Sequence, residues 1–527
     1  MSTAPPPAPS SIAHDAPLDE ALQRANAGPA RAGLDAYANQ LTRAEVASDA
    51  MQDNPAWQAQ RALGRHQGLV AQALTQDTPG RWSIWAAGLY LHGQFAPDSL
   101  DPLLLTSASL AVLRKEPPLW ARLGPLMRNP DDDARDLPIA RKTSLWMGLD
   151  ASAVQAAHTL RATPVALQAA PVGMGLWGRQ YLLSGSSPGL AAPDSDAHLL
   201  SAQTPQGPSC FFVPRWREDG QRNSLVVQPL RSAFGPLAVA DLQLDAASGY
   251  LLGEEGQGPV TFRAAASVLW LGRTLASCAL LRQALVQSLT QARGLGDVSA
   301  QPLLGSVLVD MALESEAALM LTMRLAQAFE RCDDATNDNM PPLDRAWKHV
   351  VAPAAQFWIG RRAMEITAET MEWAGAQGAL DSPQGQTLAR LFLAAPAQGR
   401  GEGMGNALCL QVLGALGRQK PAAQVLFESM EEIAGGDARI LAQLHALRAM
   451  LAQPQAEQQA MARMLVQRLV LTAQACLLHR DAPPAVAQAF ITTRLGHSGA
   501  GRVLGALDTR QMDLQHLLQR ALPESTA

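Results

Sequence analysis

The pattern of apolar residues changes twice along this chain, and these changes limit the folds open to it. Between residues 144 and 258, short apolar runs alternate with turn signals, which is typical of β-strands. The runs are residues 180–184, 198–203, 210–214, 224–228 and 238–244. The polar segment 218–223 separates two of them and predicts a hairpin loop. Strands at this spacing predict a compact β-barrel or sandwich in the middle of the chain.

On both sides of that stretch, apolar residues recur at helical spacing. The predicted helices span residues 82–95, 101–113, 311–331, 343–374, 386–393 and 405–416, with further helices over about 420–527. Asp101, followed by Pro102, predicts the N-cap of one of them, because proline is favoured at the first helical position.

The order of these segments predicts an α+β multidomain chain, and 527 residues are enough to bury several cores. We expect a helical domain, a central β-barrel domain, a second helical domain and an extra C-terminal helical domain. With a disordered tail in front, the predicted parts are residues 1–30, 31–143, 144–258, 259–418 and 419–527.

The sequence predicts a cytoplasmic protein without a membrane span. The first 30 residues are rich in Pro and Ala and lack the basic and apolar regions of a signal peptide, so we expect a disordered tail. The most apolar stretch, residues 264–286, has Arg263 at its edge and contains Arg273 and Arg282. Charges at these positions favour a buried helix over a membrane helix.

Composition excludes several classes of site. The five cysteines are isolated, which indicates buried thiols in a reducing compartment. The ten histidines form no close pair, so we expect no metal site. The net charge of -5 gives no global basic field for nucleic acid. Only four of the 42 basic residues are lysines. Arginine suits bidentate contacts with phosphate or carboxylate, but the base composition of the genome is the simpler explanation for this ratio.

A glycine-rich segment, residues 399–406, precedes one of the predicted helices and contains a single carboxylate, Glu402. Two interpretations stay open from these residues alone. The segment is an ordinary loop whose Asn406 caps the next helix, or Glu402 is a general base held at a cleft.

Several segments along residues 80–420 resemble the acyl-CoA dehydrogenase family, and most closely its AidB-like branch, the adaptive-response DNA alkylation proteins. That branch carries an extra C-terminal helical domain. The segments are residues 86–94, 194–204, 209–215, 219–223, 251–258, 301–303, 371–372, 402–406 and 409–410.

The resemblance implies a flavoprotein that holds FAD between its β domain and its second helical domain. Such proteins remove a proton from the α carbon of an acyl-CoA thioester and pass a hydride from the β carbon to flavin N5. Glu402 occupies the position of the family's catalytic base, with Gly403 beside it. The α proton is weakly acidic, so the chemistry needs a positioned base and a stabilised enolate oxygen.

The flavin motifs of the family are altered in this sequence. The glycine turn that leads into the β domain is replaced by residues 147–155, which have no such turn. Residues 180–184 correspond to the strand whose aromatic side chain flanks the flavin, and they place Tyr181 and Ser184 there. Gly375 and Gly378 remain from a second glycine turn.

Two further positions also depart from the family pattern. Residues 291–296 lack the phenylalanine of the family's Arg-x-x-Phe-Gly motif, whose arginine reaches the FAD phosphates across a subunit interface. Beside the base, Gly401 replaces an aromatic residue and Met404 replaces Ser or Thr. Loss of the aromatic wall admits water, which solvates the carboxylate and weakens the base.

The C-terminal region is the part that the AidB-like branch associates with duplex DNA. From residue 419 onward it carries ten Lys/Arg and nine Asp/Glu, too small an excess for a strong phosphate track. Arg463, Arg468 and Arg480 fall in a stretch with few acids, so they are candidate DNA contacts in a local basic stripe. The alternative is a solvated helix face.

The sequence therefore predicts an acyl-CoA dehydrogenase-family protein with weak or lost dehydrogenase activity, because its FAD motifs are altered. One alternative is a non-enzymatic, DNA-associated or stress-response scaffold that does not bind FAD, and another is a partner subunit that depends on an active relative. The family resemblance implies a homo-oligomer, dimer or tetramer, with acyl-CoA or duplex DNA as ligand.

Overall fold

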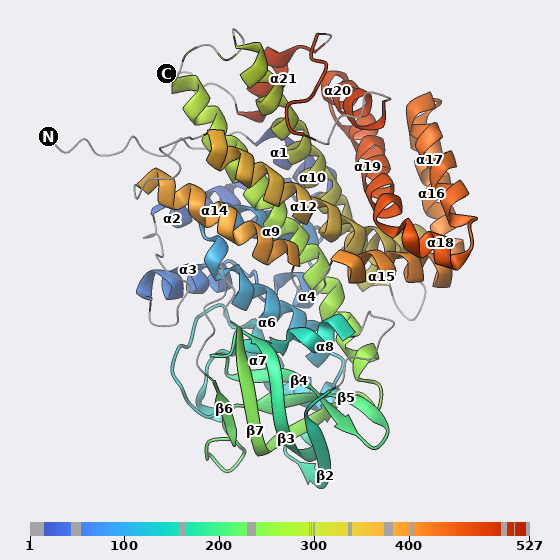
Figure 1. Cartoon of the computed structure of the whole chain (residues 1–527). Helices are drawn as coiled ribbons and strands as arrows, with labels where there is room; N and C mark the ends of the chain where they lie inside the picture. The colour runs from blue at the N-terminus through green and yellow to red at the C-terminus, as the bar shows by residue number, and fades with distance from the viewer. Residues whose placement is uncertain are drawn as a thin grey trace, which may run out of the picture.

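The computed structural model describes residues 15–43, 54–156, 165–228, 239–294, 296, 298, 301–335, 340–373, 383–400, 405–496, 503–510 and 512–522. A closed sheet forms one end of the molecule, and stacked helices form the rest (Figure 1). The predicted order of helices, strands, helices and extra helices is confirmed. The domain boundaries stay predictions.

The N-terminal helices pack against the long helices of the second half. They are α1 (Ala16–Arg24), α2 (Arg31–Arg43), α3 (Pro55–His66), α4 (Gln72–Thr75), α5 (Arg81–Phe95), α6 (Leu100–Leu113) and α7 (Pro117–Arg128). The expectation of a disordered tail over residues 1–30 is wrong for its second half. Asp15 caps α1, whose Leu18 and Leu22 are fully buried. Residues 1–14 lie outside the described part.

Seven strands form the sheet: β1 (Met147–Asp150), β2 (Gln168–Gly175), β3 (Gly178–Ala191), β4 (Ala197–Thr204), β5 (Gly207–Pro214), β6 (Leu225–Val227) and β7 (Val239–Leu252). Their order is β1-β3-β2-β4-β5-β7-β6, and β3 also pairs with β7. This pairing closes β3, β2, β4, β5 and β7 into the predicted barrel, whose interior holds a separate apolar cluster.

The predicted hairpin loop over residues 218–223 has a different role. Its local turn is present, because Trp216 and Arg222 form an isolated antiparallel bridge. The strands on its two sides, β5 and β6, do not pair with each other, and both pair with β7. The loop therefore connects β5 and β6, which lie in the same sheet on either side of β7.

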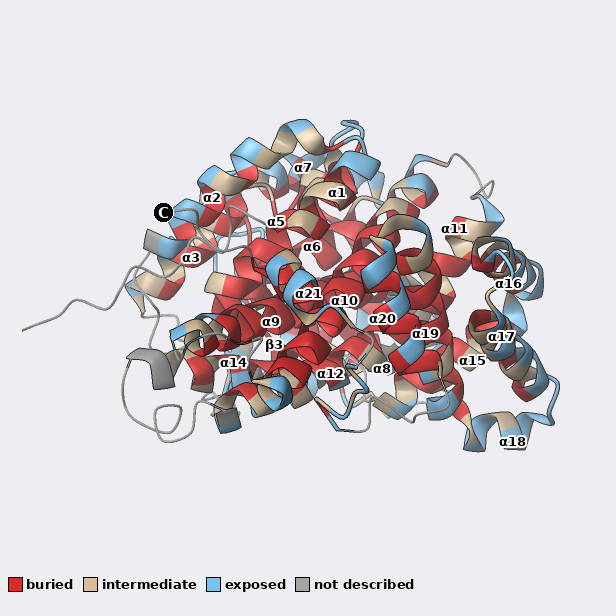
Figure 2. Ribbon diagram, turned by 90° about the horizontal axis from the view of Figure 1, so that it is seen from above, coloured by how far each residue is buried: buried red, intermediate tan, exposed pale blue. Residues whose placement is uncertain are grey.

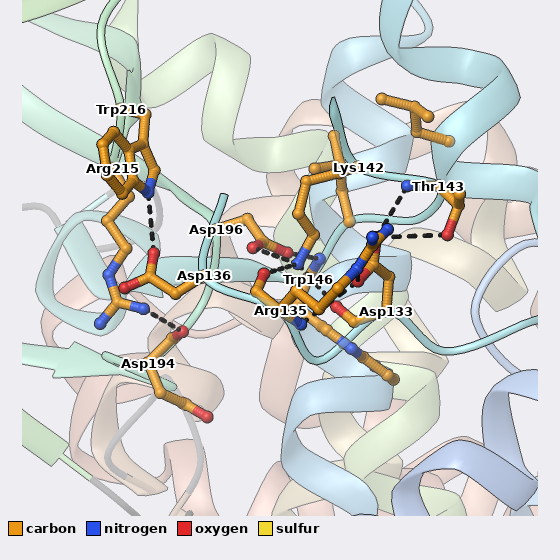
Figure 3. A network of polar contacts seen from close by, with 12 residues as sticks. Asp133, Arg135, Asp136, Lys142, Thr143, Trp146, Asp194, Asp196, Arg215 and Trp216 are labelled. Atoms are coloured by element: carbon orange, nitrogen blue, oxygen red, sulfur yellow. Dashed lines mark hydrogen bonds and ion pairs between the residues drawn. The ribbon is translucent and has the colours of Figure 1, made fainter. Parts of the chain in front are cut away.

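A buried polar network joins the N-terminal helices to the sheet (Figure 3). The Lys142 ammonium donates to the Asp196 carboxylate at 2.7 Å and to the backbone carbonyls of Asp133 and Arg135. The other oxygen of Asp196 accepts the backbone N–H of Trp146 at 2.8 Å. Asp196 belongs to one of the family-like segments, and here it fixes the entry of the chain into β1.

The second helical region is built around one central helix. Its elements are α9 (Gly258–Gly294), α10 (Pro302–Asp334), α11 (Pro342–Ala346), the π-helical turn η5 (Trp347–Val351), α12 (Ala352–Trp373), α14 (Pro383–Arg400) and α15 (Gly405–Arg418). Among the described helices, α9 alone is long and apolar enough to cross a membrane. Its most apolar window is 94% buried, as expected of a core helix (Figure 2).

The C-terminal helices are α16 (Lys420–Ala434), α17 (Ala438–Leu451), α18 (Gln455–Ala460), α19 (Ala462–Asp481), α20 (Pro484–Leu495) and α21 (Leu514–Ala521). Their apolar side chains belong to the same core cluster as those of α5, α9 and α10. Arg494 of α20 pairs with Asp310 and Glu314 of α10, and all three side chains are at most 2% exposed. The predicted extra domain therefore shares its core with the rest of the chain.

Candidate functional site

A basic cavity of about 480 Å³ lies between the N-terminal helices, α9, the end of α10, η5 and α15. This volume falls within the range of about 300–1,000 Å³ that is usual for ligand pockets. Its charged and titratable lining residues are Arg114, Lys115, Arg263, Asp333, Lys348, His349 and Arg418. Five positive side chains thus face a single carboxylate among the described lining residues, a formal surplus of four charges.

The carboxylate of this cavity is already satisfied. Asp333 forms an ion pair with Arg114 and a second one with Arg81 at 3.4 Å. In the described part of the chain, no salt bridge is formed by Lys115 or Lys348. Burial lowers the pKa of both ammonium groups. An anionic ligand would restore the balance of charge here.

Apolar and aromatic side chains form the deeper walls of the cavity. Trp82, Trp270 and Phe329 line it and are almost fully buried. The Lys348 ammonium lies 4.8 Å from the centroid of the Phe329 ring. Burial lowers the pKa of the neighbouring His349 to about 4, so that side chain is neutral at pH 7. The cavity thus suits a ligand with an anionic part and an apolar part.

The predicted base Glu402 and its neighbours Gly401, Gly403 and Met404 lie outside the described residues, which resume at Gly405. The helices on either side of that segment are described. α15 starts directly after it, and Gln411, Ala415 and Arg418 of α15 line the basic cavity. A helix of 14 residues is about 21 Å long, so α15 connects the segment of Glu402 with the cavity.

Before the segment of Glu402, α14 ends in a buried polar cluster. Gln398 accepts a hydrogen bond from Arg273 of α9 at 2.8 Å, and Arg273 also pairs with Asp101 of α6. The prediction that Asp101 is an N-cap is wrong, because α6 starts one residue earlier and Ser99 holds the cap position. The Asp101 carboxylate instead neutralises Arg273, whose side chain is 1% exposed.

The segment that corresponds to the flavin turn folds into β1 and the short helix α8 (Ala151–Ala156). Asp150, at their junction, is 3% exposed. Its Oδ1 accepts the backbone N–H groups of Ser152 at 3.0 Å and Ala153 at 3.1 Å. Its Oδ2 accepts from the hydroxyl of Ser187 at 3.3 Å. Burial raises the pKa of the Asp150 carboxyl.

Asp150 thus accepts the backbone N–H groups of Ser152 and Ala153, which a turn at this place could otherwise donate to a cofactor. An N-cap carboxylate satisfies the first N–H groups of the helix that follows it. The cavity beside Asp150 measures about 190 Å³, below the usual range for a drug-sized ligand. Its wall combines Asp150 and four serines with apolar residues such as Leu167 and Phe262.

The two described cofactor candidates of β3 point to opposite sides of the strand. Tyr181 is 3% exposed inside the barrel, packs edge-on against Phe211 and donates its hydroxyl to Glu255. Ser184 is exposed, and its hydroxyl oxygen accepts the backbone N–H of Ala246 at 3.0 Å. Contact of either side chain with flavin stays a prediction, and Tyr181 would have to leave the barrel core to make it.

The other flavin candidates are less informative. Gly375 and Gly378 lie outside the described residues. Arg293, in the segment aligned with the family's phosphate-binding arginine, donates to the backbone carbonyl of Leu522 at the end of α21. It therefore anchors the C-terminal segment of its own chain.

The three candidate DNA contacts of α19 do not form one stripe. At about 100° per residue, Arg463 and Arg468 differ by about 140° around the helix, and Arg468 and Arg480 by about 120°. Their partners lie on different elements. Arg463 donates to Asn406 at 2.9 Å, Arg468 to Gln443 at 2.6 Å, and Arg480 to both oxygens of Asp481. The predicted stripe is wrong, and contact with duplex DNA stays a prediction.

Comparison with known proteins identifies the family. Residues 262–417 match the acyl-CoA dehydrogenase C-terminal domain, and residues 48–134 match the N-terminal domain of the adaptive response protein AidB. Over 434 residues the chain is 30% identical to the putative acyl-CoA dehydrogenase AidB of Escherichia coli strain K12, covering 80% of this chain and 76% of that protein. The chain belongs to the acyl-CoA dehydrogenase family. Within the family it resembles the AidB-like proteins.

Solved structures share the fold. Caenorhabditis elegans ACDH-11 in complex with C11-CoA superposes with a TM-score of 0.76 at 16% identity, covering 99% of this chain and 93% of that chain. An acyl-CoA dehydrogenase complexed with FAD from Bacillus anthracis gives a TM-score of 0.60 at 13% identity, covering 93% and 86%. These similarities support the architecture of helices, sheet, helices and extra helices.

Proposed function

We propose that this AidB-like member of the acyl-CoA dehydrogenase family binds an acyl-CoA thioester but has weak or lost dehydrogenase activity. The observation that carries the proposal is the position of Asp150. Its carboxylate occupies backbone donors in the segment where relatives have a glycine turn that holds flavin. A buried carboxylate there would also repel the negatively charged diphosphate of FAD. The described residues at this place therefore do not fit FAD.

The basic cavity supports the binding half of the proposal. Its Lys115 and Lys348, which form no salt bridge with a described residue, suit the phosphates of coenzyme A, and its aromatic walls suit the apolar parts of an acyl-CoA. The thioester would point along α15 toward its first residue, Gly405, which directly follows the segment of Glu402 in the sequence. A relative of the same fold, ACDH-11, was solved with C11-CoA.

The visible absorption spectrum of the purified protein, before and after addition of FAD, tests the cofactor half. We expect no flavin band, even with excess FAD. A band near 1:1 occupancy would contradict this, and Glu402→Gln with a panel of acyl-CoA substrates would then test the base.

Calorimetric titration with a series of straight-chain acyl-CoA thioesters tests the binding half. We expect 1:1 binding that weakens with salt. Lys115→Gln combined with Arg418→Gln should lower the affinity about tenfold or more, because each loses a charge-assisted contact with phosphate. Arg510→Gln is the matched control, because Arg510 is 87% exposed and does not line the cavity. Equal loss in both variants, or no binding at all, would refute the proposal.

The DNA-associated scaffold gains less support from the geometry. Arg463, Arg468 and Arg480 face three directions, so they cannot follow one duplex backbone together. A gel shift with a short duplex at low ionic strength separates this alternative from acyl-CoA binding.

A further inference from the structure

A second cluster of arginines lines a smaller cavity in the helical part of the molecule. Arg24 at the end of α1, Arg324 in α10 and Arg480 near the end of α19 line a cavity of about 260 Å³. Met320, Met323 and Asp481 also line it. This cavity shares no lining residue with the basic cavity.

The charges around this arginine cavity do not cancel. Arg480 contacts both oxygens of Asp481, and Arg24 reaches the same carboxylate at 4.0 Å. Arg324 pairs with Asp344 at 2.8 Å, and the same carboxylate also forms an ion pair with Arg331 at 3.3 Å. Four arginines against two aspartates leave a formal surplus of two positive charges.

One nitrogen of Arg324 and one of Arg24 lack a good acceptor, although the Nη2 of Arg324 donates to Asp344 at 2.8 Å and the Nη1 of Arg24 to the Asp481 carbonyl at 3.4 Å. Arg324 is 8% exposed, and its Nη1 has no hydrogen-bond partner among the described residues. Burial lowers its pKa, and the nearby charges of Arg331 and Arg480 lower it further. Arg24 directs its Nη2 toward the Met320 sulfur at 3.0 Å, although a thioether is a weak acceptor. A buried guanidinium N–H without a partner is unfavourable, so an anion in the cavity would be stabilised.

We propose that the arginine cavity binds one phosphate group, either inorganic phosphate or the phosphate of a small monoester. Guanidinium groups match the oxygens of phosphate in a bidentate geometry. A phosphate monoester carries a charge of about -1.5 to -2 at pH 7, which matches the surplus of two. Because the arginines come from three elements, the bound anion holds α1 and α19 against α10.

Isothermal titration of the full-length protein with inorganic phosphate, at constant ionic strength, tests this proposal. We expect saturable binding of one phosphate, at least tenfold weaker in Arg480→Gln and in Arg24→Gln. Both side chains are partly exposed, so these variants should keep the fold. Arg510→Gln is the matched control, because Arg510 also contacts both oxygens of a nearby aspartate but lies outside the cavity.

Three results would overturn the proposal. The first is the absence of saturable phosphate binding. The second is an equal loss of affinity in Arg480→Gln and Arg510→Gln. The third is binding of a short DNA duplex that depends on Arg480 while inorganic phosphate does not bind, which would assign the arginines to nucleic acid. Loss of phosphate affinity in Arg480→Gln with unchanged acyl-CoA affinity would show that the two cavities act separately.

Discussion

At the residue scale, two buried histidines make the fold sensitive to acid. His198 in β4 has no hydrogen-bond partner for either ring nitrogen among the described residues. His92 in α5 contacts the Tyr37 hydroxyl at 2.5 Å and the Ser99 hydroxyl at 2.7 Å. Burial lowers the pKa of each imidazole from 6.5 to about 3, with the charge of Arg215 contributing at His198. Both side chains are therefore neutral in the folded protein at pH 7.

This burial predicts how stability depends on pH. Between pH 6.5 and about 3 the unfolded chain binds a proton at each histidine and the folded chain does not. The free energy of unfolding should therefore fall as the pH is lowered, by about 1.4 kcal/mol per pH unit for each site. Urea unfolding at a series of pH values measures this slope.

The variant His198→Leu isolates one of the two sites. It should reduce the slope by about one proton between pH 4 and 6. His66→Gln is the control, because that side chain is 71% exposed. If His198→Leu leaves the slope unchanged, the imidazole is not buried in its neutral form.

At the element scale, Lys142 connects the N-terminal helices to the sheet. Its side chain is 2% exposed, and that of its partner Asp196 is 11% exposed. Lys142→Met leaves the carboxylate without its cation, and removing one partner of a buried pair costs about 3–5 kcal/mol. We expect a loss of this size in urea unfolding. Arg222→Gln, which removes an exposed pair with Asp136 at the edge of the same network, should cost at most about 1 kcal/mol. Similar losses in the two variants would contradict the assigned role.

Most elements could be predicted from the sequence, because their burial requires runs of apolar residues, and the length and spacing of those runs distinguish helices from strands. This holds for α5, α9, α10 and α15 and for strands β3 to β7. Strand β2 gave no such signal, since it is mostly exposed and contains proline and glycine. The basic cavity could not be predicted either. Its charges come from distant segments of the chain and have no common local spacing. Adjacent Arg114 and Lys115 were the one local hint.

Asp101 and Asp150 show a second limit of sequence reasoning. Both were placed in the correct region, but their partners depend on tertiary packing. Asp101 meets Arg273, which is 172 positions away in the chain. Asp150 accepts the backbone N–H groups at the start of α8. The resemblance to the family predicted only that this segment lacks a glycine turn. The local sequence pattern predicts the element in which a carboxylate lies. Its hydrogen-bond and ion-pair partners depend on how that element packs against others.

At the scale of the whole molecule, the C-terminal helices share one core with the rest of the described chain. A buried cluster of four charges crosses that junction. Arg494 of α20 and Arg362 of α12 both pair with Glu314 of α10, and Arg494 also pairs with Asp310. The four formal charges cancel, so each carboxylate depends on an arginine from another helix.

This connection predicts that the C-terminal helices do not unfold as an independent domain. Arg494→Met leaves Asp310 and Glu314 with Arg362 as the one remaining cation of the cluster, at an expected cost of about 3–5 kcal/mol. We expect a single, earlier unfolding transition and faster hydrogen exchange in both α20 and α10, because the shared core couples them. Arg510→Gln should leave both unchanged. A separate early transition with faster exchange confined to α16–α21 would instead make these helices an autonomous unit, joined to the remainder by contacts that contribute little to its stability.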